Sequence, residues 1–146
     1  MNALVSTPPF QIYALCSAAL VALLYGLGYL TGTTRGARKA VVNHEDVQVY
    51  RGAAVVDVEH PDVQRVKRAH LNLVENAVPF FVIGFLYVMT DPDILVARVL
   101  LLAFVASRFL HTLFYLTGRQ PFRAACFAAG LLLNAVMLVQ VVRAVV

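Results

Sequence analysis

The chain has 146 residues, of which 60% are hydrophobic and 14% are charged, against roughly 45–50% and 25% in an average soluble domain. Small domains leave much of their surface in contact with solvent, so a soluble domain of this length could not bury so much apolar surface. The net charge of +4 comes from 12 Lys and Arg against 8 Asp and Glu, and their positions indicate a membrane surface and an anionic ligand, with no nucleic-acid partner. We therefore expect an all-α integral membrane protein, a single membrane domain over residues 1–146 with four transmembrane helices of about 20 residues each.

The first predicted span covers about residues 10–30 and contains no charged residue. Pro8 and Pro9 precede it and suit the start of a helix. No Lys or Arg lies before this segment, and its apolar run is longer than the core of a signal peptide, so we expect it to remain as a transmembrane helix. Residues 31–60 are polar and are predicted to form a loop, the largest piece outside the membrane.

A second helix is predicted to begin at Pro61, outside the bilayer, because charged residues occupy its first turns. The remaining spans are predicted at about residues 69–89, 94–116 and 122–142. Short polar turns separate these three spans. The prediction is therefore a four-helix bundle with neighbouring helices antiparallel.

The distribution of Lys and Arg predicts the orientation of the bundle. Nine of them lie in the long loop or beside the short turn at the same end, namely Arg35, Arg38, Lys39, Arg51, Arg65, Lys67, Arg68, Arg119 and Arg123. The opposite end has two, Arg98 and Arg143. The positive-inside rule then places the loop in the cytoplasm. Short loops and spans rich in Ala and Val favour a bacterial inner membrane over the endoplasmic reticulum.

Polar side chains within the spans recur every three or four residues, which places them on single helical faces. These faces hold Arg65, Arg68, Asn72 and Glu75 in the second helix, Arg108, His111 and Tyr115 in the third, and Arg123 and Phe127 in the fourth. Ionisable residues within a membrane usually face the interior of a bundle or a water-filled cavity. Since all of these lie toward the cytoplasmic end, together with Arg35, we predict a cationic pocket that contains one carboxylate.

Such a pocket suits a small anionic ligand that also carries an amino group. Arginines bind carboxylates through paired hydrogen bonds, Glu75 could bind an ammonium group, and Asn72 could pair with an amide. A buried arginine would also lower the pKa of a thiol by stabilising its thiolate.

Structural roles are the alternative for several of these residues. Phosphate headgroups could be anchored by Arg35, Arg38, Lys39 and Arg65, above all by Arg38 and Lys39. An ion-pair network could form among Arg68, Glu75 and Arg108. His111 could be a hydrogen-bonding residue between helices. His70 and His111 have no third ligand at a suggestive spacing, so no metal site is predicted.

The stretch from Val63 to Phe80, with its core Arg-Ala-His-Leu-Asn-Leu-Val-Glu at 68–75, resembles the signature of the MAPEG family, membrane-associated proteins in eicosanoid and glutathione metabolism. Two later blocks, at 108–116 and 121–124, are similar to the family as well. The resemblance runs over nearly the whole chain. It implies a homotrimer of four-helix subunits with glutathione bound in clefts between neighbours, on the cytoplasmic side.

The resemblance also implies roles for individual residues. The positions that match glutathione-contacting residues are Arg35, Arg68, Asn72, Glu75, His111 and Tyr115. Arg123 matches the arginine that stabilises the glutathione thiolate and is the predicted catalytic residue. Arg65 and Arg108 match structural supports, and Asp46 matches a loop aspartate of the prostaglandin E synthase branch.

Two departures from the pattern distinguish between branches. Ala124 and Leu71 stand where the prostaglandin E synthase branch has a serine and an arginine, whereas the string at 68–72 is similar to the first type of microsomal glutathione transferase. The resemblance thus implies a membrane glutathione transferase acting on hydrophobic electrophiles, with peroxidase activity on lipid hydroperoxides. The alternatives are a glutathione-dependent isomerase or conjugase of the prostaglandin E or leukotriene C synthase type, and a non-enzymatic lipid-binding membrane protein.

Overall fold

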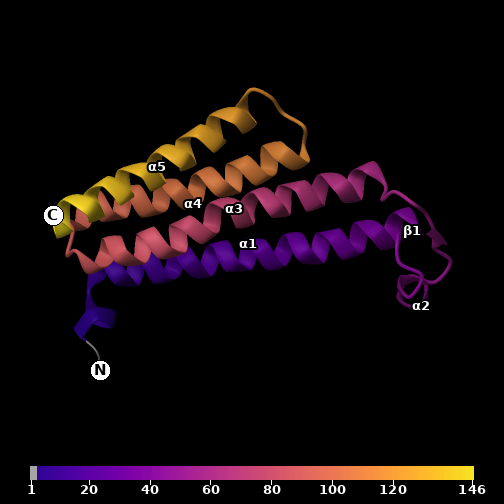
Figure 1. Ribbon diagram of the computed structural model, residues 1–146, viewed down its shortest axis with the longest axis horizontal. Coiled ribbons are helices and arrows are strands. Elements are labelled where there is room, and N and C mark those ends of the chain that lie inside the picture. The colour runs from indigo at the N-terminus through magenta and orange to yellow at the C-terminus, as the bar shows by residue number, and fades with distance from the viewer. Residues whose placement is uncertain (1–2) are drawn as a thin grey trace.

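The computed structural model describes residues 3–146 as an elongated bundle of four long helices (Figure 1). These helices are α1 (Pro8–Arg38), α3 (Pro61–Met89), α4 (Ile94–Leu116) and α5 (Phe122–Val145), and a short 3-10 helix, η1 (Ala3–Ser6), precedes them. Each long helix is sufficiently apolar and long to cross a membrane. The expectation of an all-helical membrane bundle with four spans is therefore confirmed at the level of the single chain.

The helices pack through a continuous apolar core in which α1 contacts α3 and α4, while α5 contacts α4 and α3. Phe80 of α3 and Phe104 of α4 stack at its centre with 4.4 Å between ring centroids. Tyr13 of α1 lies against Gly84 of α3, where a Cβ atom would approach the ring to 3.1 Å. The same tyrosine donates a hydrogen bond to the carbonyl of Phe81 at 2.8 Å. Small and aromatic residues thus bring α1 and α3 into close contact.

Helix starts follow the signals in the sequence. Pro61 occupies the first position of α3, and Nδ1 of His60 accepts a hydrogen bond from the backbone N–H of Asp62 at 3.2 Å. Asp93 caps α4 by accepting from the N–H groups of Leu95 and Val96 at 2.9 and 3.0 Å. These caps satisfy backbone donors that have no partner within the helix.

The predicted loop begins later than expected, because α1 continues through residues 31–38. The hydroxyls of Thr31 and Thr34 donate to the carbonyls of Leu27 and Leu30 one turn earlier, at 2.8 and 2.7 Å, so these polar residues remain helical. The end of the apolar run near residue 30 is therefore not the end of the helix. Likewise, α5 extends to Val145, past the predicted end at residue 142.

The connection between α1 and α3 contains regular structure of its own. It includes β1 (Ala40–Val41), α2 (Asp46–Val49) and β2 (Ala54–Val55), and the two strands pair in parallel. The side chain of Tyr50 packs against α1, where an added Cβ atom would lie 3.2 Å from its hydroxyl oxygen at Gly32 and 3.1 Å from its ring at Gly36. The connection is thereby folded back onto the end of α1.

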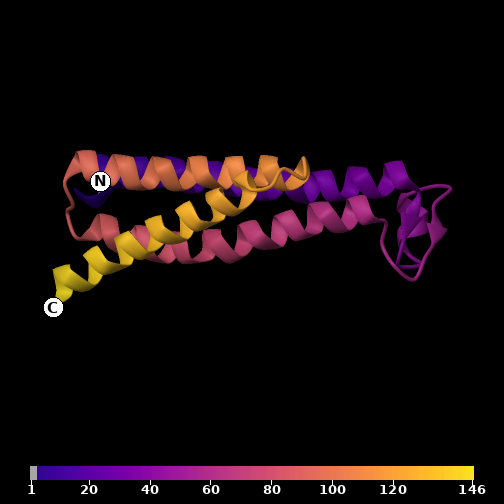
Figure 2. The same cartoon turned by 90° about the horizontal axis from the view of Figure 1, so that it is seen from above.

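Both α1 and α3 extend beyond the turn between α4 and α5, as two perpendicular views show (Figures 1 and 2). The folded connection lies at the far tip of this extension. We call this end of the bundle, from the α4–α5 turn to the tip, the loop end. The loop end contains the C-terminal halves of α1 and α4 and the N-terminal halves of α3 and α5.

Candidate functional site

Apart from Asp46 on the connection, the predicted site residues lie between the middle of the long helices and the loop end, because the helices alternate in direction. Within one chain they do not form a single pocket. They divide between a pocket shared by α3, α4 and α5, a polar cluster between α1 and α3, an outward face of α3, and the helix core. The sequence predicted the common end of the bundle but not this division.

The first group lines a pocket of about 290 Å³ that we call the three-helix pocket. Its lining residues are Asn72, His111, Tyr115, Gln120, Arg123, Ala124 and Phe127. The guanidinium of Arg123 lies over the ring of Tyr115, 4.7 Å from its centroid. Such a contact attracts the cation to the ring face, while its N–H groups point outward in the plane of the guanidinium, where they can donate hydrogen bonds.

Polar groups at the edges of the three-helix pocket define what it can bind. The side-chain oxygen of Asn72 is buried and has no hydrogen-bond partner within residues 3–146. Buried polar atoms normally have a partner, so this oxygen is available to an N–H donor from a ligand or from solvent. The Gln120 amide, turned so that its oxygen faces Arg123, accepts from that guanidinium at 2.6 and 3.1 Å. His111 lies between two aromatic rings, with centroids 5.7 Å from Tyr115 and 6.3 Å from Phe127.

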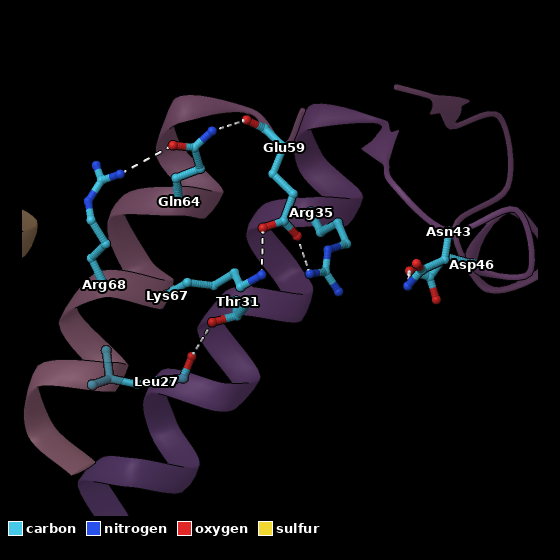
Figure 3. Close-up of polar contacts among 9 residues, drawn as sticks. All are labelled: Leu27, Thr31, Arg35, Asn43, Asp46, Glu59, Gln64, Lys67 and Arg68. Atoms are coloured by element: carbon cyan, nitrogen blue, oxygen red, sulfur yellow. Dashed lines mark hydrogen bonds and ion pairs between the residues drawn. The ribbon is translucent and has the colours of Figure 1, made fainter. Parts of the chain in front are cut away.

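The second group is a polar cluster between α1 and α3, which we call the Glu59 cluster (Figure 3). It consists of Arg35, Glu59, Gln64, Lys67 and Arg68. One carboxylate oxygen of Glu59 accepts from Arg35 of α1, and the other accepts from Nζ of Lys67 of α3 at 2.8 Å. Gln64 donates to the backbone carbonyl of Glu59 at 2.8 Å and accepts from Arg68 at 3.2 Å. Glu59 therefore joins two helices and is linked to two predicted glutathione-binding arginines.

Glu59 remains a carboxylate because of these cations. Its side chain is only 9% exposed. Burial raises the pKa of the Glu59 carboxyl, but the hydrogen bonds and positive charges of Lys67 and Arg35 outweigh burial and hold this pKa below its ordinary value. An adjoining pocket of about 410 Å³ is lined by Glu59, Gln64, Lys67, Arg68 and Leu71.

The polar face of α3 points outward in the single chain. Arg65, Arg68 and Glu75 are exposed and Asn72 is partly buried, whereas the buried face of α3 carries apolar residues such as Leu73 and Phe80. Glu75 has no salt bridge within residues 3–146. It lines a separate pocket of about 230 Å³ between α3 and α5, near Asn134. The spacing correctly grouped these residues on one face but did not show which way that face points.

Arg108 lies inside the bundle and is 1% exposed. It donates to the backbone carbonyl of Cys126 at 2.6 Å and to the hydroxyl of Ser107 at 3.2 Å, and it lies over the ring of Phe104. The alternative of an ion-pair network among Arg68, Glu75 and Arg108 is wrong, since none of the salt bridges in the described chain joins these residues.

Three predicted residues lie away from the three-helix pocket and from the pocket beside Glu59. Asp46 is on the folded connection, where its carboxylate accepts from the Asn43 amide at 3.3 Å, to one side of the Glu59 cluster (Figure 3). Arg65 reaches toward the turn at Gly118. Arg38, one of the predicted headgroup anchors, pairs with Asp62 at 2.5 Å. Within residues 3–146 no group of His, Cys, Asp and Glu has the composition to hold a metal ion.

Sequence reasoning missed the polar partners of the arginines. Glu59 and Lys67 are separated from Arg35 by 24 and 32 positions, and no periodic pattern connects them across the loop. Gln64 could have been found, because it precedes Arg68 by four residues, a spacing at which side chains meet on a helix. Gln120 lies in the turn before α5, where this spacing rule does not apply.

Comparisons with known proteins agree with the resemblance in the sequence. The model of the MAPEG family matches residues 13–143. Prostaglandin E synthase of Bos taurus is 38% identical over 131 residues, covering 89% of this chain and 85% of the relative. Prostaglandin E synthase of Homo sapiens is 35% identical over 137 residues, 93% of this chain and 90% of the relative. Microsomal glutathione S-transferase 1 of Sus scrofa is 34% identical over 134 residues, 89% of this chain and 86% of the relative. These identities are too close to separate the two kinds of relative.

Proposed function

Because the chain belongs to the MAPEG family, and a glutathione S-transferase is among its relatives, we propose that it is a membrane-bound glutathione transferase. Its site would activate the glutathione thiol for attack on hydrophobic electrophiles and, as a second activity, on lipid hydroperoxides. The observation that carries this proposal is the position of Arg123. Its guanidinium lies over the ring of Tyr115 in a pocket that also contains Asn72 and His111.

The proposed chemistry begins with loss of the thiol proton. Arg123 would stabilise the thiolate, and each unit by which the thiol pKa falls corresponds to roughly 1.4 kcal/mol of differential stabilisation. The thiolate sulfur would then form a bond with an electrophilic carbon while a leaving group departs with its electron pair. With a hydroperoxide, two glutathione molecules would supply the two electrons that convert it to an alcohol and water, leaving the glutathione disulfide.

The remaining residues would hold glutathione in place. Its two carboxylates call for cations, for which Arg35 and Arg68 are the candidates. Asn72 has an unpartnered side-chain oxygen that could accept from a peptide N–H of the ligand. Glu75 would bind the ammonium group.

The outward face of α3 supports a homotrimer with sites between subunits. A carboxylate on the apolar surface of a membrane helix is unfavourable unless a polar group covers it. Glu75 is exposed and has no ion-pair partner within residues 3–146, and contact with a neighbouring copy would cover it. The same contact would bring Glu75 and Arg68 toward a site completed by the neighbour.

An isomerase of the prostaglandin E synthase type is the second candidate, because relatives of that name are 35–38% identical to the chain. Two residues disfavour it. Ala124 brings only a methyl group to the three-helix pocket, and Leu71 brings an apolar side chain to the pocket beside Glu59. Comparing turnover of an aryl halide with turnover of a cyclic endoperoxide lipid, each with glutathione, distinguishes the two candidates.

The direct test is an ultraviolet difference spectrum of the purified protein in detergent, titrated with glutathione. We expect a saturable thiolate band at neutral pH in the wild type. Arg123→Ala should lose this band, keep part of its glutathione affinity and lose turnover by roughly a hundredfold, because a preorganised cation is removed from the developing anion.

Arg119→Ala is the matched control, since Arg119 is exposed on the adjacent turn and does not line the three-helix pocket. It should keep the thiolate band. Turnover of Arg123→Ala within about twofold of the wild type would contradict the role assigned to this arginine. Absence of glutathione binding by the wild type would instead favour a non-enzymatic lipid-binding protein.

A further inference from the structure

The contact between Glu59 and Arg35 leaves the arginine only partly satisfied. One oxygen of Glu59 accepts from Nη2 of Arg35, while Nε of Arg35 is buried and has no partner within residues 3–146. The hydrogens on Nε and Nη2 point along the same edge of a guanidinium, and a carboxylate normally binds that edge through both of its oxygens. Glu59 uses one oxygen there because its other oxygen is held by Lys67 at 2.8 Å.

A carboxylate from outside could therefore bind Arg35 better than Glu59 does. It would satisfy both donors on that edge, including the buried Nε. Only the side chain of Glu59 would need to rotate, because Gln64 holds its backbone carbonyl at 2.8 Å. After release, Glu59 would keep its second ion pair with Lys67 (Figure 3).

We propose that Glu59 is an internal placeholder that occupies the edge of Arg35 where a carboxylate of the ligand binds. Glutathione binding exchanges the Glu59–Arg35 ion pair for a ligand–Arg35 ion pair. This inference rests on the proposed function, since it takes glutathione as the ligand of Arg35. The Glu59–Arg35 ion pair therefore weakens glutathione binding. The apparent dissociation constant equals the intrinsic one divided by the fraction of molecules in which Arg35 is free.

The test is the dissociation constant of glutathione, measured calorimetrically on the full-length protein in detergent. Glu59→Gln keeps the shape of the side chain and removes its charge. We expect this variant to bind glutathione about three- to tenfold more tightly, the range expected for loss of one competing ion pair. Combined with Arg35→Gln, the same substitution should no longer tighten binding, because the competition requires Arg35.

Asp62→Asn is the matched control. Asp62 also pairs with an arginine at the loop end, Arg38, but it does not contact Arg35. This variant should bind glutathione within about twofold of the wild type. The melting temperature gives a second measurement on the same variants. Its rise on adding glutathione should be larger for Glu59→Gln than for the wild type.

The outcomes separate this inference from the proposed function. The wild type could bind glutathione while Glu59→Gln binds it equally well or more weakly. Glu59 would then position Arg35, and the inference that it is a placeholder would be wrong. The proposed function would still stand. Equal tightening in Glu59→Gln and Asp62→Asn would show a general charge effect and would also overturn the placeholder. If the wild type does not bind glutathione, the proposed function fails and the inference fails with it.

Discussion

At the scale of single residues, the fit between Arg108 and Gly130 determines how α4 packs on α5. The guanidinium of Arg108 occupies the space that a Cβ atom at position 130 would need. The same guanidinium donates to the carbonyl of Cys126 one turn away on α5. A glycine at this position lets a long charged side chain lie flat against the backbone of its neighbour.

We expect Gly130→Ala to lower the free energy of unfolding by about 1–3 kcal/mol, because the added methyl group overlaps the guanidinium of Arg108. Chemical denaturation in detergent would measure this change. Gly26→Ala on α1 is the control, since nothing lies within 4 Å of a Cβ atom there, and it should change stability by less than about 0.5 kcal/mol or raise it. Equal losses in both variants would show that the loss at position 130 does not come from overlap with the guanidinium of Arg108.

At the scale of helices and their connections, the sequence predicted starts better than ends. Pro61 marked the beginning of α3 through local chemistry that a short window contains, and the short polar turn before residue 94 marked the beginning of α4. The end of α1 was placed too early because hydropathy falls after residue 30, while the threonines beyond it bond to carbonyls of their own helix. Hydropathy reports the surroundings of a helix and not where its hydrogen bonds stop.

The candidate site was predicted residue by residue but not as an arrangement. Spacing placed Arg68, Asn72 and Glu75 on one face of α3, yet the direction of that face depends on how α3 packs against three other helices. Glu59 was missed because it lies on the connection before α3, while its partner Arg35 lies on α1, 24 positions away. Contacts of this kind are properties of the packed bundle and leave no local pattern.

The bridge from α1 to α3 through Glu59 should make stability depend on pH. The folded carboxyl has a pKa below its ordinary value of 4.5, so in acid the unfolded chain takes up a proton at this site before the folded chain does. The stability supplied by Glu59 is thus complete above the ordinary value and declines as pH falls through the folded pKa.

We expect the wild type to be more stable than Glu59→Gln at about pH 7, with the difference shrinking at about pH 4 and below. Melting temperatures of both proteins across this range would measure it. A difference that stays constant with pH would mean that the charge of Glu59 does not support the α1–α3 contact.

At the scale of the whole molecule, the nine Lys and Arg residues toward the loop end predict that this end faces the cytoplasm. Single cysteines can test this in a background where Cys16 and Cys126 are replaced by Ala. Val49→Cys lies at the loop end and Val146→Cys at the opposite end, and both positions are well exposed. A membrane-impermeant maleimide should label Val49→Cys only in inside-out vesicles and Val146→Cys only in right-side-out vesicles. The reverse pattern would invert the proposed orientation.

The unequal lengths of the helices have a consequence for kinetics. With 31 residues, α1 is about 46 Å long against a hydrocarbon layer of about 30 Å, so the Glu59 cluster at its end is expected to project into the headgroup region or beyond. Glutathione would then approach a positively charged tip through water, and its association rate should fall as added salt screens that charge. The apolar substrate would approach from the bilayer, at a rate that follows its partition coefficient and is little affected by salt. Ionic strength and lipid solubility should therefore act on the two substrates separately.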